Sequence, residues 1–227
     1  MPPDAAGSLE EDEYLAIKDY IFDLKYSGSI QKIEKYPTTQ SFKVPNKESR
    51  PEIPWQHFGG KINAQRYSPI DLIDNENVKD LEIAWRWKSK AFGNFQEIRN
   101  VSMPIMRNGL VFIGVGSTRS IAAIDAENGE TVWIWNPNEG ARFSSAARKD
   151  SGKGVAYFED ENGKKRVIAI TPGYQLVSLD ADTGIADKNF GVNGIVDLTV
   201  GMRTSSKQEL DVGSTSPPLV IDDVIIV

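Results

Sequence analysis

Two aspartates first suggest catalysis in this sequence, because a pair of carboxylates can act as general acid and general base. Asp125 lies within residues 123–131 and Asp180 within residues 178–184, and each opens the same pattern, Asp-Ala-x-x-Gly. An aspartate directly before a turn commonly accepts hydrogen bonds from the backbone that follows it. The pattern therefore predicts two structural turn caps rather than a catalytic pair.

Other catalytic residue types are scarce in the 227-residue chain, which contains no cysteine and one histidine, His57. The lack of cysteine excludes disulfides, thiolate metal sites and cysteine nucleophiles within the chain. A single histidine cannot build a His-rich metal site. We expect His57 to be structural or to lie at the surface.

The charge balance is acidic, with 26 Lys and Arg against 32 Asp and Glu, a formal net charge of −6 and a pI of about 5.0. Nucleic-acid binding needs a basic surface, so we expect no nucleic-acid partner. No apolar run reaches the roughly 18–20 residues of a membrane span. The start of the sequence shows no secretory signal.

The elements that carry these residues belong to a repeat. The two aspartates lie 55 residues apart (180 − 125). The pattern of residues 102–113 returns at 216–227, which is 114 residues later (216 − 102), or two steps of 57. A repeat of this length made of short strands is typical of a β-propeller blade. We therefore predict an all-β fold, a partial β-propeller.

Apolar runs bounded by turn residues predict two sets of strands and the beginning of a third. These runs are 110–115, 120–125 and 131–135, then 154–159, 167–171 and 176–180, then 219–220 and 224–227. Asn108-Gly109, Asn128-Gly129 and Asn162-Gly163 predict tight turns, since Asn and Gly tolerate positive φ. Trp133 and Trp135 end the first set, and we expect their rings to be buried between adjacent blades.

The residues before the repeat divide into two parts. Residues 8–25 are predicted to be helical, from the capping box Ser8-Leu9-Glu10-Glu11 and an apolar stripe at three- and four-residue steps. Residues 28–54 are polar and rich in proline, which predicts an extended linker. We expect a helical part at 1–27, this linker, and the first blades of a propeller at 55–227.

About three units of this length fit into residues 55–227, whereas propellers close with roughly four to eight blades. An open series of blades would leave an apolar strand edge unpaired, which natural proteins avoid. We therefore expect the chain to be a fragment of a longer protein.

Several sequence motifs in residues 55–227 resemble those of the pyrroloquinoline-quinone (PQQ)-dependent dehydrogenases, and they are most similar to the glucose-dehydrogenase-like branch. They are Trp55-Gln56-His57-Phe58-Gly59-Gly60, Gln65-Arg66-Tyr67-Ser68-Pro69-Ile70, Asn77-Val78-Lys79-Asp80-Leu81 with Ala84-Trp85, Gly154-Val155-Ala156-Tyr157, Thr171-Pro172-Gly173-Tyr174 continuing to Ala181, Phe190-Gly191-Val192-Asn193-Gly194, and Thr215-Ser216-Pro217-Pro218. The resemblance implies an eight-bladed quinoprotein propeller that oxidises sugars or alcohols, typically in the periplasm.

The resemblance also implies cofactor-binding residues. Lys153 takes the place of a basic residue, usually Arg, that pairs with the quinone, and Thr215 matches a cofactor-bonding threonine. A frequent acidic position of the family is Val101 here, with Glu97 four residues earlier, so that role is not transferred. Ala147-Arg148 stand where methanol-oxidising members carry adjacent cysteines, which argues against that branch.

The family's calcium ligands, its catalytic Asp base and the Trp under the quinone lie downstream of the Thr215 blade. The resemblance therefore implies PQQ and Ca²⁺ as cofactors, a fragment that is inactive alone, and no catalytic residue within it. Met1-Pro2-Pro3 and the predicted helix resemble the end of a c-type cytochrome, with Met1 as axial ligand of a haem. In such a quinohaemoprotein, electrons would pass from the reduced quinone to the haem.

The sequence thus indicates part of a PQQ-dependent glucose or alcohol dehydrogenase that passes electrons to a cytochrome or quinone acceptor. Two alternatives stay open. One is a non-catalytic propeller scaffold related to outer-membrane-assembly lipoproteins. The other is an enzyme that has lost its cofactor, which Lys153 and Val101 would fit.

Overall fold

The computed structural model describes residues 39–41, 55–89, 97, 100–202, 212–222 and 224–227. All of them belong to one of the two units into which the chain divides, residues 38–227. The helix expected at 8–25, most of the linker expected at 28–54, and Met1 lie outside the described residues.

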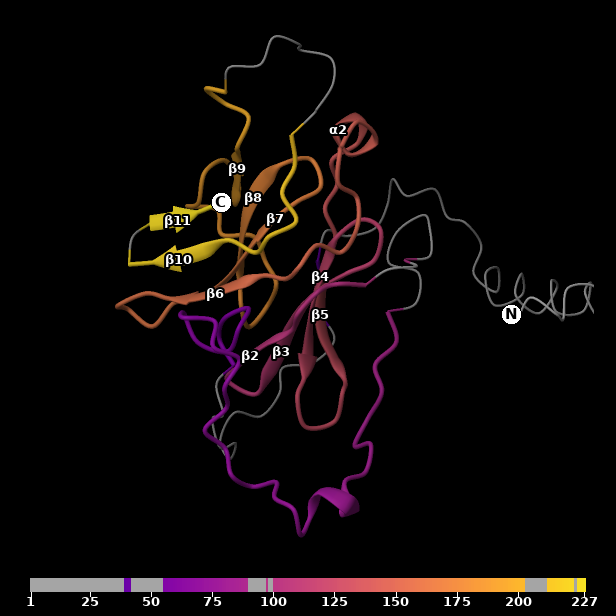
Figure 1. Cartoon of the computed structure of the whole chain (residues 1–227). Coiled ribbons are helices and arrows are strands. Elements are labelled where there is room, and N and C mark those ends of the chain that lie inside the picture. Colours follow the sequence, from indigo (N-terminus) through magenta and orange to yellow (C-terminus); the bar gives the residue numbers. More distant parts are fainter. Residues whose placement is uncertain (1–38, 42–54, 90–96, 98–99, 203–211, 223) are drawn as a thin grey trace, which may run out of the picture. The chain divides into compact units, whose positions relative to one another are not determined.

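The described residues form three antiparallel sheets (Figure 1). The first has the order β1-β5-β4-β3-β2 and consists of β1 (Thr39–Ser41), β2 (Ile105–Arg107), β3 (Leu110–Val115), β4 (Ser120–Asp125) and β5 (Thr131–Trp135). The second has the order β6-β7-β8-β9 and consists of β6 (Ala156–Glu159), β7 (Lys165–Ile170), β8 (Gln175–Asp180) and β9 (Ile195–Asp197). The third pairs β10 (Leu219–Ile221) with β11 (Val224–Ile226).

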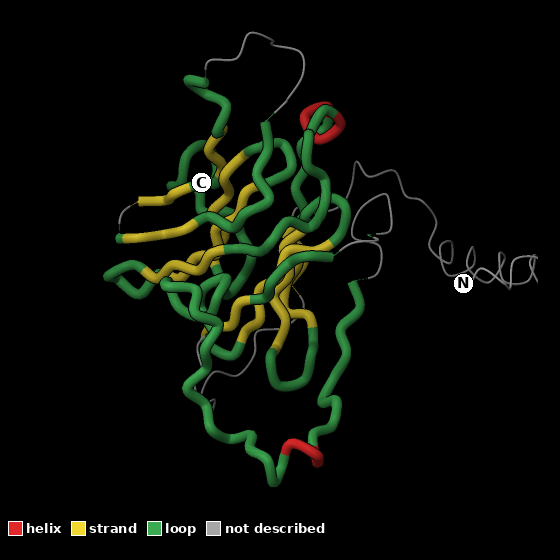
Figure 2. Tube along the Cα trace, viewed as in Figure 1, coloured by secondary structure: helices red, strands yellow, loops and turns green. Residues whose placement is uncertain are grey.

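Helix is almost absent from the part of the chain that is described (Figure 2). It is limited to the one-turn helix α2 (Ala141–Ser144) and the 3-10 turn η3 (Val78–Asp80). No described helix has the length and apolarity that crossing a membrane would require. These observations confirm the predicted all-β class.

The predicted strands 110–115, 120–125 and 131–135 agree residue for residue with β3, β4 and β5. The prediction for β7 began two residues late, because Lys165 and Arg166 open that strand and hide its apolar pattern. The strands β1, β2 and β9 were missed. Each has three residues, which is too short for an alternating pattern to show.

The repeat seen in the sequence is a repeat of backbone geometry. Arg119 and Tyr174, 55 residues apart (174 − 119), both adopt left-handed φ values, 55° and 58°. They hold the same place, directly before β4 and before β8. Asn108 and Asp222 likewise are left-handed in the first hairpins of their sheets. The sheets are therefore successive copies of one unit.

The two repeated aspartates cap turns, as predicted. Asp125 Oδ1 accepts a hydrogen bond from the Glu127 N–H at 2.9 Å. Asp180 Oδ1 accepts from the backbone of Asp182 at 3.1 Å and of Thr183 at 2.9 Å. Both carboxylates therefore serve the turn that follows them.

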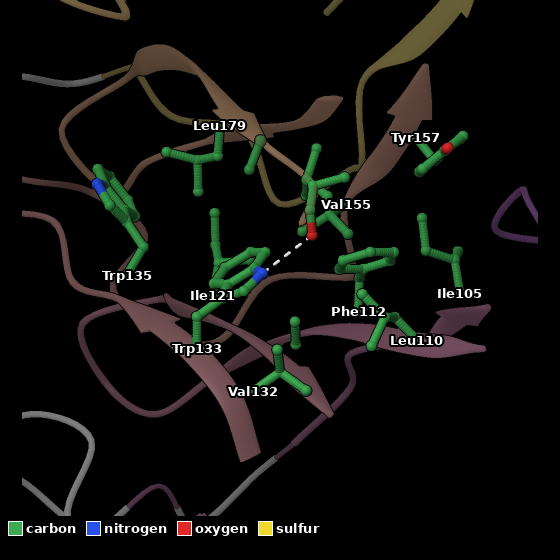
Figure 3. Packing of buried hydrophobic residues seen from close by; sticks show 14 of the residues in the cluster. Ile105, Leu110, Phe112, Ile121, Val132, Trp133, Trp135, Val155, Tyr157 and Leu179 are labelled. Carbon is green, nitrogen blue, oxygen red and sulfur yellow. Dashed lines mark hydrogen bonds between the residues drawn. The ribbon is translucent and has the colours of Figure 1, made fainter. Parts of the chain in front are cut away.

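The first two sheets share one hydrophobic core, with Trp133 at its centre (Figure 3). The Trp133 side chain has no exposed surface, and its indole N–H donates to the Ala181 carbonyl of the second sheet at 2.9 Å. The Phe112 ring lies 6.0 Å from that of Trp133 and 6.1 Å from that of Tyr157. The expected burial of Trp133 between blades is confirmed.

The same contact occurs one unit earlier. The Trp85 indole N–H donates to the Ala126 carbonyl at 3.0 Å, and its ring packs on Gly129. The ring of Trp133 packs in the same way on Gly184. Each turn of the form Asp-Ala-x-x-Gly is therefore a socket for a tryptophan from the preceding unit.

Strand direction gives each sheet two distinct ends. The upper end is defined here as the end where β3 and β7 finish and where β2 and β6 begin, and the lower end is that of the Asp125 and Asp180 turns. The residues that precede the first strand of each unit therefore enter at the upper end. The tryptophan sockets lie at the lower end.

An ion-pair cluster ties together turns at the lower end of the second sheet. Arg166 donates to Asp187 at 2.7 Å and to Asp160 at 3.1 Å, and Lys164 donates to Asp187 at 3.1 Å. Burial alone would raise the pKa of Asp187, but the hydrogen bonds from Arg166 and Lys164 outweigh burial and lower it to about 2.

This lowered pKa makes a prediction about acid stability. The ionised Asp187 stabilises the fold fully above the ordinary aspartate pKa of 3.8, and that contribution is lost as the pH falls toward 2. Asp187→Asn should remove on the order of 2 kcal/mol of unfolding free energy at neutral pH, and less in acid. Urea unfolding at pH 7 and pH 3 measures this, with Asp71→Asn at an exposed position as control. An equal loss at both pH values would contradict the assignment.

The tryptophan socket makes a second prediction, with a matched control. Gly184 and Gly163 have nearly the same left-handed φ, 71° and 75°, but a Cβ on Gly184 would lie 2.6 Å from the Trp133 ring, whereas Gly163 has open space. Gly163→Ala should cost about 1–2 kcal/mol through backbone strain. Gly184→Ala should cost about 1–3 kcal/mol more through overpacking. Urea unfolding measures the loss of unfolding free energy in both variants. Equal losses would show that Trp133 is not tightly packed on Gly184.

Candidate cofactor site

Three entry segments, each preceding the first strand of its unit, meet at the upper end. The Met103 N–H donates to the Lys153 carbonyl at 2.9 Å, and the Lys153 N–H donates to the Thr215 carbonyl at 2.7 Å. The segments lead into β2, β6 and β10 respectively. The structure thus brings together Lys153 and Thr215, which the sequence places 62 residues apart (215 − 153).

The side chains at this junction present hydrogen-bond donors. Lys153 is exposed and Thr215 is half-buried. Neither the Lys153 ammonium group nor the Thr215 hydroxyl bonds to a described residue. Glycines on both sides of Lys153 allow the close approach, since a Cβ on Gly154 would lie 2.9 Å from the Met103 carbonyl oxygen.

Arg119 is buried beneath this junction, with a 5% exposed side chain. Its Nε donates to the Asp150 carbonyl at 3.0 Å, and Nη2 donates to the Arg148 carbonyl at 3.3 Å and to Asp150 Oδ1 at 3.4 Å. Nη1 donates to the carbonyls of Ser214 at 2.6 Å and Ile170 at 3.2 Å. Burial lowers the pKa of Arg119, but an arginine keeps its charge at physiological pH.

The Glu97 carboxylate also binds backbone groups in this region. Its Oε1 accepts from the Ser151 N–H at 3.0 Å, and its Oε2 accepts from the Gly116 N–H at 3.1 Å. The carboxylate thus joins the segment before Lys153 to the β3–β4 connection. Val101, at the position where the resembled family often has an acid, is half-buried and brings no carboxylate.

The residues around α2 dock on the upper end of the second sheet. Glu139 accepts from the Thr171 hydroxyl at 2.6 Å and from the Gly173 N–H at 2.9 Å. Arg142 forms a two-point pair with Asp197, at 2.6 and 2.7 Å. The hydrogen bond from Arg142 holds the pKa of Asp197 well below its usual range. These pairs fix the loop that leads from β5 toward Lys153.

His57 forms a local backbone turn with Gly60. Its backbone exchanges hydrogen bonds with Gly60, at 2.8 and 3.3 Å, while neighbouring Trp55 pairs with Met106 on the free edge of β2. Burial lowers the pKa of His57. The side chain is half-buried, and its expected structural role stays a prediction.

Sequence reasoning missed Arg119 and left Glu97 without a role. The available signal was a charged residue between two apolar strands, in Ser117-Thr118-Arg119-Ser120. Within the described ranges, no group of three or more His, Cys, Asp and Glu side chains is arranged to hold a metal ion.

Successive antiparallel sheets that pack through tryptophan sockets define a protein of the β-propeller class. Residues 55–227 match the PQQ family "Glucose/ethanol/alcohol dehydrogenase, beta-propeller domain". The chain therefore belongs to this family of quinoprotein dehydrogenases, and the resemblance seen in the sequence is confirmed.

Curated relatives and solved structures agree with this assignment. Similar proteins include a quinate/shikimate dehydrogenase (quinone) of Acinetobacter baylyi, 28% identical over 81% of this chain and 25% of its own length, and a quinoprotein glucose dehydrogenase of Gluconobacter oxydans, 28% identical over 78% of this chain and 23% of its own length. The chain thus spans about a quarter of the length of these relatives.

Among solved structures, a quinohaemoprotein alcohol dehydrogenase of Pseudomonas putida HK5 is similar, with a TM-score of 0.56 and 25% identity over 76% of this chain and 22% of that protein. A europium-containing methanol dehydrogenase shares the fold, with a TM-score of 0.53 and 20% identity over 76% of this chain and 26% of that protein.

The Glu97 brace makes a prediction about local order. Glu97→Gln keeps one acceptor oxygen but turns an amide N–H₂ toward one of the two backbone N–H donors, so one bond is lost at a cost of about 1–3 kcal/mol. Amide hydrogen exchange at Ser151 and Gly116 should become faster, whereas Glu161→Gln, an exposed control in the β6–β7 turn, should change neither. Unchanged exchange in Glu97→Gln would show that the brace is dispensable.

Proposed function

We propose that this chain forms part of a PQQ-dependent dehydrogenase that oxidises a C–OH group of a sugar or an alcohol. Family membership supports the reaction class. The observation that carries the proposal is the hydrogen bond from Lys153 N–H to the Thr215 carbonyl at 2.7 Å, because it joins the backbones of two residues from different units that both carry donor side chains.

The donor set fits this cofactor. PQQ is an anionic ortho-quinone, and its oxygens are acceptors that a cation and a hydroxyl can bind. Lys153 would hold one of these oxygens with its exposed ammonium group, and Thr215 would donate its hydroxyl. A lysine offers a point charge rather than the two-point fork of an arginine, so orientation depends more on the backbone around it. When bound, PQQ supplies the two-electron oxidant.

The rest of the proposal concerns the whole protein. We place the Ca²⁺ ligands and the catalytic Asp base in sequence outside this chain, and expect this chain alone to be inactive. Electrons would pass to a haem or quinone acceptor in the periplasm. The axial ligation of a c-type haem by Met1 is a further part of this proposal and rests on the resemblance of residues 1–21 to a cytochrome end.

The test is equilibrium binding of PQQ, with Ca²⁺ present, to the full-length gene product. Lys153→Ala should weaken PQQ binding by about 10- to 100-fold, because a hydrogen bond to a charged group is lost. Lys153→Arg should bind at least as tightly as the unsubstituted protein. Lys188→Ala, at another exposed lysine, is the matched control.

Two results would contradict the proposal. If the full-length protein does not bind PQQ, the non-catalytic scaffold or the enzyme that has lost its cofactor becomes the better description. If PQQ binds but Lys153→Ala binds as tightly as Lys188→Ala, the cofactor lies elsewhere. Dye-coupled oxidation of glucose and small alcohols by the PQQ-loaded protein then tests the reaction itself.

A further inference from the structure

Arg119 connects the two candidate cofactor-binding residues through one side chain. Its guanidinium donates to the carbonyl of Ser214, the residue directly before Thr215, at 2.6 Å. It also donates to Asp150 and Arg148, in the segment directly before Lys153. The segments before Lys153 and Thr215 therefore share one buried hydrogen-bond donor group.

The geometry requires an arginine. The five hydrogen bonds of Arg119 leave from Nε, Nη1 and Nη2 toward four carbonyls and one carboxylate. A guanidinium has five N–H donors in a rigid plane, whereas a lysine has three donors at a single point. A lysine at this position could not reach all the acceptors at once, so carbonyls in this buried or part-buried region would lose a partner.

The blade repeat itself does not explain this residue. The equivalent position in the second sheet is Tyr174, which has the same left-handed backbone and packs its side chain against the apolar cluster around Ile168 and Leu176. A left-handed residue other than Gly carries backbone strain. The turn therefore needs a left-handed conformation but no arginine. What is particular to Arg119 is the set of carbonyls that its side chain binds.

The adjacent backbone is built around the guanidinium. A Cβ on Gly152 would lie 3.1 Å from Nε of Arg119, and Gly152 has a left-handed φ of 69°. The Gly152 N–H donates to Asp150 Oδ1 at 3.1 Å, the same oxygen that Arg119 binds. Gly152, next to Lys153, therefore leaves the space that the Arg119 side chain occupies.

We propose that Arg119 is the positioning residue of the cofactor site, which holds the segments 148–152 and 214 so that Lys153 and Thr215 present their donors to one ligand. This inference rests on the proposed function. Arg119 does not touch the ligand itself. It acts through the backbone, and its loss changes cofactor affinity rather than the chemistry of a bound substrate.

The experiment measures two properties of the full-length protein, the PQQ dissociation constant with Ca²⁺ present and amide hydrogen exchange in residues 148–155 without PQQ. The variants are Arg119→Gln and Arg119→Lys. Arg166→Gln is the matched control, because Arg166 is also a largely buried, ion-paired arginine, but its partners Asp187 and Asp160 lie at the lower end.

Both Arg119 variants should raise the PQQ dissociation constant about 10- to 100-fold, as expected when a group that orients ligating residues is removed. They should also speed exchange in residues 148–155. At saturating PQQ the KM for substrate should stay unchanged. Arg166→Gln should lower the urea midpoint without either change at the upper end.

The proposal is overturned if Arg119→Gln binds PQQ as tightly as the unsubstituted protein, or if Arg166→Gln weakens binding equally. If Arg119→Gln does not fold, the PQQ dissociation constant of Arg119→Lys is compared with those of the unsubstituted protein and Arg166→Gln in the same way. If the unsubstituted protein binds no PQQ, the proposed function fails, and hydrogen exchange still decides on Arg119. Faster exchange confined to its variants supports positioning, and unchanged exchange contradicts it.

Discussion

The packing of Trp133 against the turn of the next sheet is the interaction on which the rest of this structure depends. The indole needs a carbonyl for its N–H and a flat, side-chain-free surface for its ring. Ala181 supplies the carbonyl, and Gly184 supplies the surface. Asp180 holds the turn in shape through its downstream backbone. Three of the five positions in Asp-Ala-x-x-Gly therefore serve one tryptophan.

The two ends of the sheets are held by different physical means. At the lower end an apolar ring and a capped turn set how the first two sheets pack, and the ion pairs of Arg166 join the turns of the second sheet. At the upper end the entry segments are held by backbone hydrogen bonds and by two charged groups, the buried guanidinium of Arg119 and the half-buried carboxylate of Glu97. Polar contacts at the upper end are compatible with the proposed role of this end in binding a charged cofactor.

Much of the fold could be predicted from the sequence because the pattern is local. Strands such as 110–115 and 120–125 are long enough for apolar runs and turn residues to show their bounds, and the Asp-Ala-x-x-Gly repeat shows the period. Short strands such as β2 and β9 form because a neighbouring strand offers hydrogen bonds, which no local pattern records.

The site was predictable only in part. Lys153 and Thr215 were proposed as cofactor-binding residues through family resemblance, and their adjacency follows from the packing of separate units. The contacts of Arg119 with Ile170 and Ser214 span 51 and 95 residues of sequence. Nothing within a few residues of Arg119 indicates those partners. Glu97 was given no role because it lies four residues before the acidic position of the family. Its partners are the backbone N–H groups of Gly116 and Ser151, 19 and 54 residues away in the sequence.

The most direct test of this account is a crystal structure of the full-length gene product with PQQ and Ca²⁺ bound. We expect the Lys153 ammonium group and the Thr215 hydroxyl to lie within hydrogen-bond distance of PQQ oxygens, with Arg119 still bound to the Ser214 and Asp150 carbonyls beneath them. A quinone bound away from the upper end, or a Lys153 side chain in solvent with PQQ present, would contradict the central claim that this junction is the cofactor site.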